Sequence, residues 1–95
     1  SVLSSYFYEE FFLNQVASIY RSIVKNHAFG DANKRTGTVV LSLIIYNNLN
    51  VVLGEDELVD LALDVANNKY SVSVIAKRIN KALLNSMYPY HKQLK

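Results

Sequence analysis

Every residue but Ser42 between Val39 and Tyr46 is apolar. On a helix with 3.6 residues per turn these side chains point in nearly every direction, so almost no face is left for water. We therefore expect a helix over about 33–48 that lies in the middle of a bundle. A buried β-strand is the alternative, because the run is dense in β-branched residues. The run is far shorter than the ~20 residues of a membrane span, so we expect no membrane partner.

Three further segments have helical spacing, and the 3 glycines and 1 proline of the 95 residues leave few places where a helix must stop. We expect helices over 8–26, from near Gly54 to Asn67, and from an N-cap at Ser71 or Ser73. Asn47, Asn48 and Asn50 are expected to end the helix over 33–48, because asparagine tolerates left-handed backbone. These segments predict an all-α protein, a compact bundle of four or more helices in a single domain over 1–95. The expected buried positions are Phe12, Leu13, Val16, Ala17, Ile19, Tyr20, Ile23, Val24, Leu58, Leu61, Ala62, Val65, Val72, Ile75, Ile79 and Leu83.

Composition excludes several classes of protein. With no cysteine the chain has no disulfide, no zinc-thiolate site and no cysteine nucleophile. A net charge of +2 is too small and too evenly spread for broad electrostatic attraction to nucleic acid, so no direct nucleic-acid binding is expected. Any bound metal would be held by oxygen or imidazole ligands.

The segment from His27 to Gly37 carries the groups best suited to chemistry. A helix that begins near Asn33 points free backbone N–H groups and its positive dipole end outward, which favours anions. Lys34 and Arg35 add a point charge and a planar fork for phosphate oxygens. Asp31 is a natural Mg²⁺ ligand beside phosphates, and a neutral His27 could accept a proton from a hydroxyl.

A simpler interpretation exists for each of these groups. Asp31 and Asn33 could cap the helix, Lys34 and Arg35 could be solvated, and His27 could bond a carbonyl at a helix end. For the five groups taken together this interpretation is weaker, because capping a helix needs one such group rather than five. Phe29 is expected to anchor the loop in the bundle and so support its polar neighbours.

The string His27-x-Phe29-x-Asp31-Ala32-Asn33-Lys34-Arg35-Thr36 resembles the signature of the Fic/Doc family, specifically its Doc ("death on curing") toxin branch. The likeness extends to about Leu84 and includes the start of the last helix near Lys69–Ala76. It implies a Fic/Doc-type helical bundle in which the signature loop joins two helices around a phosphate cradle.

The resemblance also implies a role for each residue of the signature. His27 would be the general base, Asp31 would bind Mg²⁺, and ATP phosphates would be held by Ala32, Asn33, Lys34 and Arg35. Typical Fic members have glycine where Lys34 stands and arginine where Thr38 stands, and they transfer AMP to a protein hydroxyl. In the Doc branch these changes accompany reversed ATP, so the expected reaction is transfer of the γ-phosphate.

By the same resemblance the chain would be a cytoplasmic toxin of a toxin–antitoxin module. It would be a phosphotransferase that phosphorylates a threonine of elongation factor Tu, and a helix of a Phd-like antitoxin would neutralise it. We expect the aromatic block Tyr6–Phe12 to be ordinary core; an exposed antitoxin groove is the alternative. Doc-like chains have about one more helix ahead of this block, so with Ser1 at its start the chain is expected to lack the family's N-terminal segment.

Three other functions compete with this expectation. The first is AMP transfer by the same site, which Lys34 and Thr38 disfavour. The second is a catalytically silent helical interaction module, in which the signature only stabilises the fold. The third is a helix-turn-helix DNA binder, which the apolar body of the helix beyond Val39 disfavours.

Overall fold

A computed structural model describes residues 2–26 and 31–87, and all of its regular structure is helical. The four helices are α1 (Val2–Val24), α2 (Asp31–Leu49), α3 (Glu55–Asn67) and α4 (Val72–Met87). The all-α fold expected from the sequence is therefore confirmed, and the strand alternative for 39–46 is wrong. Within the described residues, no helix is long and apolar enough to cross a membrane.

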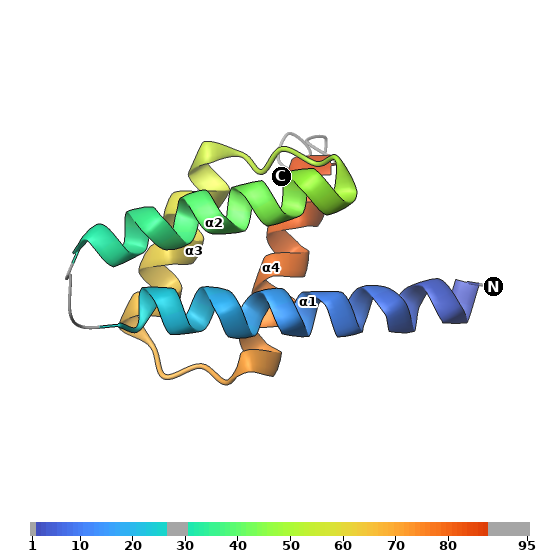
Figure 1. Ribbon diagram of the computed structural model, residues 1–95, viewed down its shortest axis with the longest axis horizontal. Coiled ribbons are helices and arrows are strands. Elements are labelled where there is room, and N and C mark those ends of the chain that lie inside the picture. The colour runs from blue at the N-terminus through green and yellow to red at the C-terminus, as the bar shows by residue number, and fades with distance from the viewer. Residues whose placement is uncertain (1, 27–30, 88–95) are drawn as a thin grey trace, which may run out of the picture.

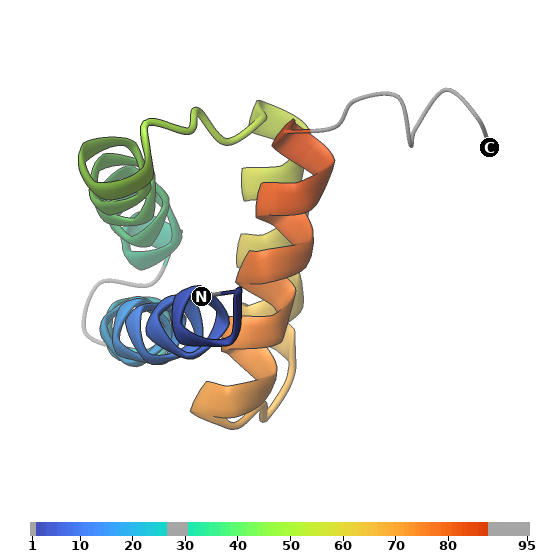
Figure 2. The same ribbon diagram turned by 90° about the vertical axis from the view of Figure 1, so that its right-hand side faces the viewer.

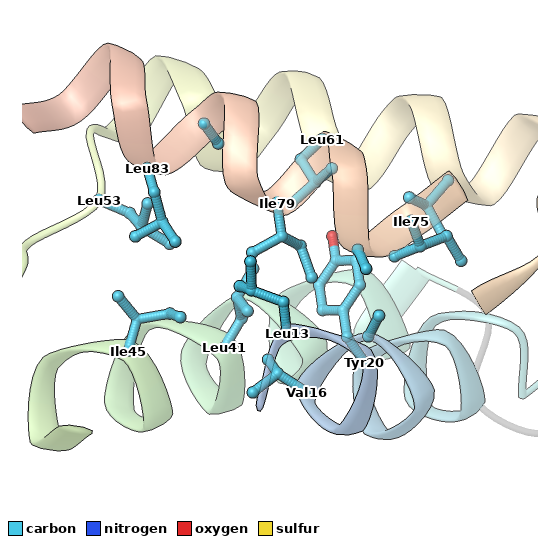
Figure 3. Close-up of a cluster of buried hydrophobic side chains, with 14 of the residues drawn as sticks. Leu13, Val16, Tyr20, Leu41, Ile45, Leu53, Leu61, Ile75, Ile79 and Leu83 are labelled. Atoms are coloured by element: carbon cyan, nitrogen blue, oxygen red, sulfur yellow. The ribbon is translucent and has the colours of Figure 1, made fainter. Parts of the chain in front are cut away.

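Helix α1 packs against each of the other three helices, and α4 crosses it at a steep angle (Figure 1). Helix α2 returns beside α1 from the signature loop, and α3 and α4 stand together on the other side (Figure 2). The core between them is formed almost entirely by aliphatic side chains with Tyr20 among them (Figure 3). The largest fully buried side chains are Tyr20, Leu41, Ile45, Val65, Ile75 and Ile79.

The helix ends follow local chemistry. Asn50 has a φ of 55°, and it stands just after α2, where a left-handed residue ends the helix. Three acidic residues, Glu55, Asp56 and Glu57, occupy the first turn of α3, where the helix dipole favours them. Ser71 caps α4, because the N–H of Val74 donates to its Oγ at 3.3 Å, which decides between the two serines considered for this cap.

The buried faces of α3 and α4 agree with the apolar spacing of the sequence. Leu61, Ala62 and Val65 of α3 are buried, as are Ile75, Ile79 and Leu83 of α4. Leu58 and Val72 are partly buried against this core. Helical periodicity predicted these positions because each helix has one apolar stripe and a charged opposite face.

The expectation for α2 is wrong in one respect. Its inner face is buried at Leu41 and Ile45, but Val39, Leu43 and Tyr46 are exposed by 56%, 55% and 52%. The helix lies at the edge of the bundle, against α1 and α3 (Figure 2), so only one of its sides has neighbours. A helix that is apolar on every side can be buried on every side. It is buried only where other helices pack against it, and the sequence pattern of α2 does not indicate how many do.

Helix α1 differs from expectation at its edges. Its buried face holds Leu13, Val16, Ala17, Tyr20 and Val24, but Ile19 is 46% exposed. Phe12 packs against the core only in part, and Phe11 is 66% exposed. The core interpretation of the aromatic block is therefore wrong for Phe11, and the side chains of Tyr6, Phe7 and Tyr8 lie outside the described residues.

Candidate functional site

The signature segment joins the end of α1 to the start of α2. Helix α1 closes with a turn in which the N–H of Lys25 donates to the carbonyl of Arg21 at 2.9 Å. Helix α2 begins at Asp31, two residues earlier than the expected start at Asn33. His27 and Phe29, the expected base and the expected loop anchor, lie outside the described residues, as does the side chain of Asp31.

The four expected phosphate-binding residues occupy the first turns of α2. Ala32 and Arg35 are exposed and Lys34 is half-buried. The first N–H groups of a helix have no carbonyl within the helix to bond, so this end of α2 combines free donors with a positive dipole. Two cationic side chains follow directly, and an anion at this end would meet both kinds of attraction.

Asn33 differs from its neighbours because it points inward. Its side chain is only 5% exposed, and it is the one polar side chain among the buried described residues. Its Nδ2 has no hydrogen-bond partner within the described residues. An unpaired buried donor lowers the stability of the folded state by about 1–3 kcal/mol, so native proteins rarely contain one without a functional or structural cause. A ligand that accepts a hydrogen bond from this Nδ2 is one such cause.

Gly37 lies one turn beyond Asn33 on the same inward side of α2. A Cβ built at this glycine would stand 2.8 Å from Cγ2 of Val24 and 3.4 Å from Cε1 of Tyr20. Helix α2 can approach the end of α1 this closely only because residue 37 has no side chain. Gly37 is not among the site residues expected from the sequence, although a glycine inside a helix costs stability and so indicates a position where two helices come close together.

Two basic side chains attach the end of α1 to the loop between α3 and α4. Nζ of Lys25 donates to the carbonyls of Asn68 at 2.6 Å and Ala66 at 3.2 Å, and Nε of Arg21 donates to the carbonyl of Tyr70 at 3.1 Å. Lys25 therefore neutralises the C-terminal carbonyls of α3, where cations are favoured. These bonds hold the residues from which the signature loop departs.

The same loop is held by Asp64, which accepts three kinds of bond. Oδ1 accepts from the Tyr70 hydroxyl at 2.8 Å and from Nδ2 of Asn68 at 3.1 Å. Oδ2 lies 3.5 Å from Nε of Arg78, whose guanidinium also stacks over the Tyr70 ring. The bond to Asp64 raises the pKa of Tyr70 above its usual value, because the carboxylate stabilises the protonated hydroxyl.

Tyr20 places a second polar atom in the core. Its ring is 2% exposed and reaches from α1 toward α4 (Figure 3), and its hydroxyl has no partner within the described residues. Burial raises the pKa of this hydroxyl far above its ordinary value. Tyr20 contacts the Gly37 position by its ring edge, so the ring is part of the surface on which α2 rests.

Two further features of the described residues lie apart from this end of α2. A cleft of about 140 Å³ between α1 and α4 is lined by polar groups over an apolar floor of Leu13 and Ala76. Its polar lining residues are Glu10, Asn14, Ser73, Lys77 and Asn80. No cluster of three or more histidine, aspartate or glutamate side chains occurs within 2–26 and 31–87.

Comparison with known proteins gives one match. The model of the Fic/DOC family matches residues 3–45, which is α1, the signature loop and most of α2. The match ends at Ile45, whereas the likeness expected from the sequence extends to about Leu84. No curated protein and no solved structure matches the chain. The match contains every residue of the signature, so the part of the chain that holds the candidate site is similar to the Fic/DOC family.

Proposed function

We propose that this protein is a Doc-like phosphotransferase that moves the γ-phosphate of ATP to a hydroxyl of a protein. The observation that carries the proposal is the start of α2, where the backbone N–H groups of the first turn, the half-buried Lys34 and the exposed Arg35 adjoin the buried amide of Asn33. Members of the Fic/DOC family are typically transferases that use ATP with Mg²⁺, and the family match covers this segment. Phosphoryl transfer depends mainly on positioning the reactants and neutralising the charge of the phosphates, and the N-terminal end of α2 could provide both.

The donors at this end fit a phosphate chain. Nδ2 of Asn33 has no acceptor among the residues that the structure describes, and a phosphate oxygen would supply one in place of the lost hydration. Arg35 can bond two phosphate oxygens through its planar guanidinium, and Lys34 adds a compact charge. Asp31, the first residue of α2, would hold Mg²⁺, which would offset the negative charge of the phosphates.

In the proposed reaction, the oxygen of the target hydroxyl attacks the γ-phosphorus. The bond between this phosphorus and the β,γ-bridging oxygen breaks, and ADP leaves. The proton of the hydroxyl passes to the imidazole of His27, which acts as the general base. Lys34 and Arg35 hold the phosphate oxygens in place while charge shifts onto the leaving group.

The AMP transferase is the runner-up and uses the same residues with ATP reversed. It needs room beside the first turn of α2, where the family typically has glycine and this chain has the half-buried Lys34. Thr38, also half-buried, stands where an arginine would hold the outer phosphates. Both departures favour attack on the γ-phosphorus. The silent interaction module remains the outcome if no transfer occurs.

We infer the biological setting from the resemblance to the Doc branch. The target would be a threonine of elongation factor Tu in the cytoplasm, so that the protein acts as a toxin on translation. The neutralising partner would be the helix of a Phd-like antitoxin. The exposure of Phe11 favours the antitoxin-groove interpretation of the aromatic block, because an aromatic side chain that is 66% exposed is available to a partner.

The direct test incubates the protein with elongation factor Tu, Mg²⁺ and ATP labelled on either the γ- or the α-phosphate. Transfer of the γ label alone is the expected result. Transfer of the α label would replace the kinase by the AMP transferase, and transfer of neither label would favour the silent module.

Three variants locate the reaction in the same assay. His27→Ala should slow transfer by about 10² to 10⁴ while nucleotide still binds, because base catalysis typically contributes that factor in rate. Arg35→Ala should weaken binding of the nucleotide. Lys81→Ala removes an exposed cation of α4 and should leave transfer unchanged, which controls for the loss of a surface charge.

A further inference from the structure

The outer face of α2 carries an unbroken exposed stripe. Val39, Leu43 and Tyr46 follow one another at helical spacings of four and three residues, and each is more than half exposed. The stripe lies opposite Gly37, Leu41 and Ile45, which face the bundle. Figure 2 shows α2 on the outside of the bundle, with one flank that faces no other helix of the described chain. Three large apolar side chains in a row form the kind of patch that a partner covers.

The chemistry around this stripe narrows the choice of partner. No charged residue occurs from Thr36 to Gly54, so the face offers nothing to an acidic or basic ligand. Nucleic acid, phosphopeptides and charged amphipathic segments all depend on such groups. The partner face must therefore be apolar and uncharged.

The two ends of the stripe differ in charge. Exposed Arg35 lies one turn before Val39 on the same side of the helix, at the positive end of α2. The last turn of α2 contains no basic residue. Its final carbonyls have no N–H to bond within the helix and carry the negative end of the dipole. A second α2 in antiparallel orientation would place each Arg35 beside these carbonyls of the other copy.

We propose that the outer face of α2 is an interface between two copies of this chain, with the two α2 helices antiparallel about a two-fold axis near Leu43. The stripe from Val39 to Tyr46 has its midpoint next to this leucine, so Leu43 packs against Leu43 of the second copy. Tyr46 of each copy lies beside Val39 of the other, where a buried tyrosine gives much apolar contact for little lost side-chain entropy. Like charges do not meet in this arrangement, because the run from Thr36 to Gly54 has no charged residue and the two Arg35 side chains lie at opposite ends of the pair.

The small area of the stripe limits the affinity of the two copies for each other. Stable interfaces use about 20–30 residues a side, and one helix face supplies fewer. We therefore expect a weak dimer whose population rises with protein concentration, with dissociation constants on the order of tens of micromolar or above.

Sedimentation equilibrium of the whole chain over a wide concentration range tests the proposal. The wild-type chain should dimerise reversibly, and Leu43→Glu or Leu43→Lys alone should be monomeric, because each puts two like charges face to face at the axis. A mixture of the two variants should form a heterodimer, because the charges facing each other are then opposite. This rescue is specific to an interface in which residue 43 meets itself.

Val59→Glu is the matched control. Val59 is 51% exposed on α3, so the substitution adds the same charge at an equally exposed apolar position away from α2. It should dimerise like the wild type. Far-ultraviolet circular dichroism checks that each variant is folded. If Leu43→Glu is not folded, Val39→Asp serves as the second variant of the stripe. A wild-type chain that stays monomeric at every concentration, or a dimer that both Leu43→Glu and Val39→Asp leave intact, would overturn the proposal.

Discussion

Gly37 of α2 lies so close to Val24 of α1 that a Cβ at the glycine would stand 2.8 Å from Cγ2 of the valine. This approach lies four residues from Asn33 and one residue from Thr38, so it sets how the start of α2 rests on the end of α1. Tyr20 forms the other wall of the contact, at 3.4 Å from the same Cβ position. The geometry of the candidate site therefore depends on a residue that has no side chain.

Gly37→Ala should destabilise the protein although alanine is the better helix former. The overlap with Val24 costs about 1–3 kcal/mol, whereas the gain in helix propensity is only about 1 kcal/mol. We expect a net loss of about 1 kcal/mol, measured by urea unfolding. Gly54→Ala is the comparison without an overlap, because the nearest atom to its Cβ position is 3.7 Å away. Gly54 is an N-cap, where glycine is preferred to alanine, so its loss of about 0.5–1 kcal/mol should come from capping alone and should not change when Val24 is truncated.

Val24→Ala tests the same contact from the other side. The double variant Gly37→Ala with Val24→Ala should be more stable than the sum of the two single losses predicts, because the truncated valine no longer meets the new methyl group. Simple additivity of the two losses would show that the overlap is relieved elsewhere.

Tyr20→Phe should leave stability unchanged or raise it by up to about 1 kcal/mol. The hydroxyl is buried without a partner within the described residues, so its removal ends a desolvation cost while the ring keeps its packing. Tyr70→Phe is the matched comparison and should cost about 1 kcal/mol, because its hydroxyl donates to Asp64 at 2.8 Å. If chemical denaturation finds Tyr20→Phe the more damaging change, the Tyr20 hydroxyl has a partner.

Stability should fall at alkaline pH in a way that depends on Tyr20. Burial raises the pKa of its hydroxyl in the folded state above the value of 10.0 for a free tyrosine. Above pH 10 the unfolded chain loses this proton before the folded chain does, so the stabilisation that is complete below that pH is lost as pH rises.

The stability difference between wild type and Tyr20→Phe isolates this effect, because all other titrating groups are common to both chains. Measured at about pH 8 and about pH 11, it should move in favour of the phenylalanine variant at the higher pH. An identical difference at both values would contradict the raised pKa.

Lys25→Ala should destabilise the end of α3 by about 1 kcal/mol. The ammonium group bonds the carbonyls of Asn68 and Ala66, and both would lose a charged donor near a helix C-terminus. Lys25→Met keeps most of the apolar stem and should show nearly the same loss, which separates the bonds from packing. Lys77→Ala, an exposed lysine of α4, is expected to change thermal stability little; an equal loss there would point to net charge instead.

ATP with Mg²⁺ should raise the melting temperature if the start of α2 holds the phosphates. A ligand at about 100 times its dissociation constant stabilises the folded state by about 2.7 kcal/mol. Arg35→Ala should reduce the rise and Lys81→Ala should preserve it, when both are measured by thermal shift against protein without nucleotide. A rise that survives Arg35→Ala in full would place the nucleotide elsewhere, with the cleft between α1 and α4 as the next candidate.

The bounds of α3, the end of α2 and the start of α4 could be predicted closely from local chemistry, whereas α1 begins at Val2, six residues before its expected start at residue 8. The acidic first turn of α3, the serine that caps α4 and the asparagine that follows α2 are each decided by neighbouring residues, so short-range rules suffice. The buried faces of α3 and α4 follow from one apolar stripe on each helix. The residue types of the candidate site are also readable in the sequence, because five chemically distinct groups are concentrated within a few positions.

Tertiary packing decided what those local patterns leave open. Val39, Leu43 and Tyr46 are as apolar as Leu41 and Ile45, and only the positions of α1 and α3 determine which of them are covered. The inward placement of Asn33 and the need for glycine at 37 likewise depend on how close α1 comes. The sequence by itself determined four helices and the segment in which the groups of the candidate site are concentrated, because each depends on residues that are neighbours in the chain. The tertiary structure decided which faces of these helices meet, because burial depends on residues that are distant in sequence.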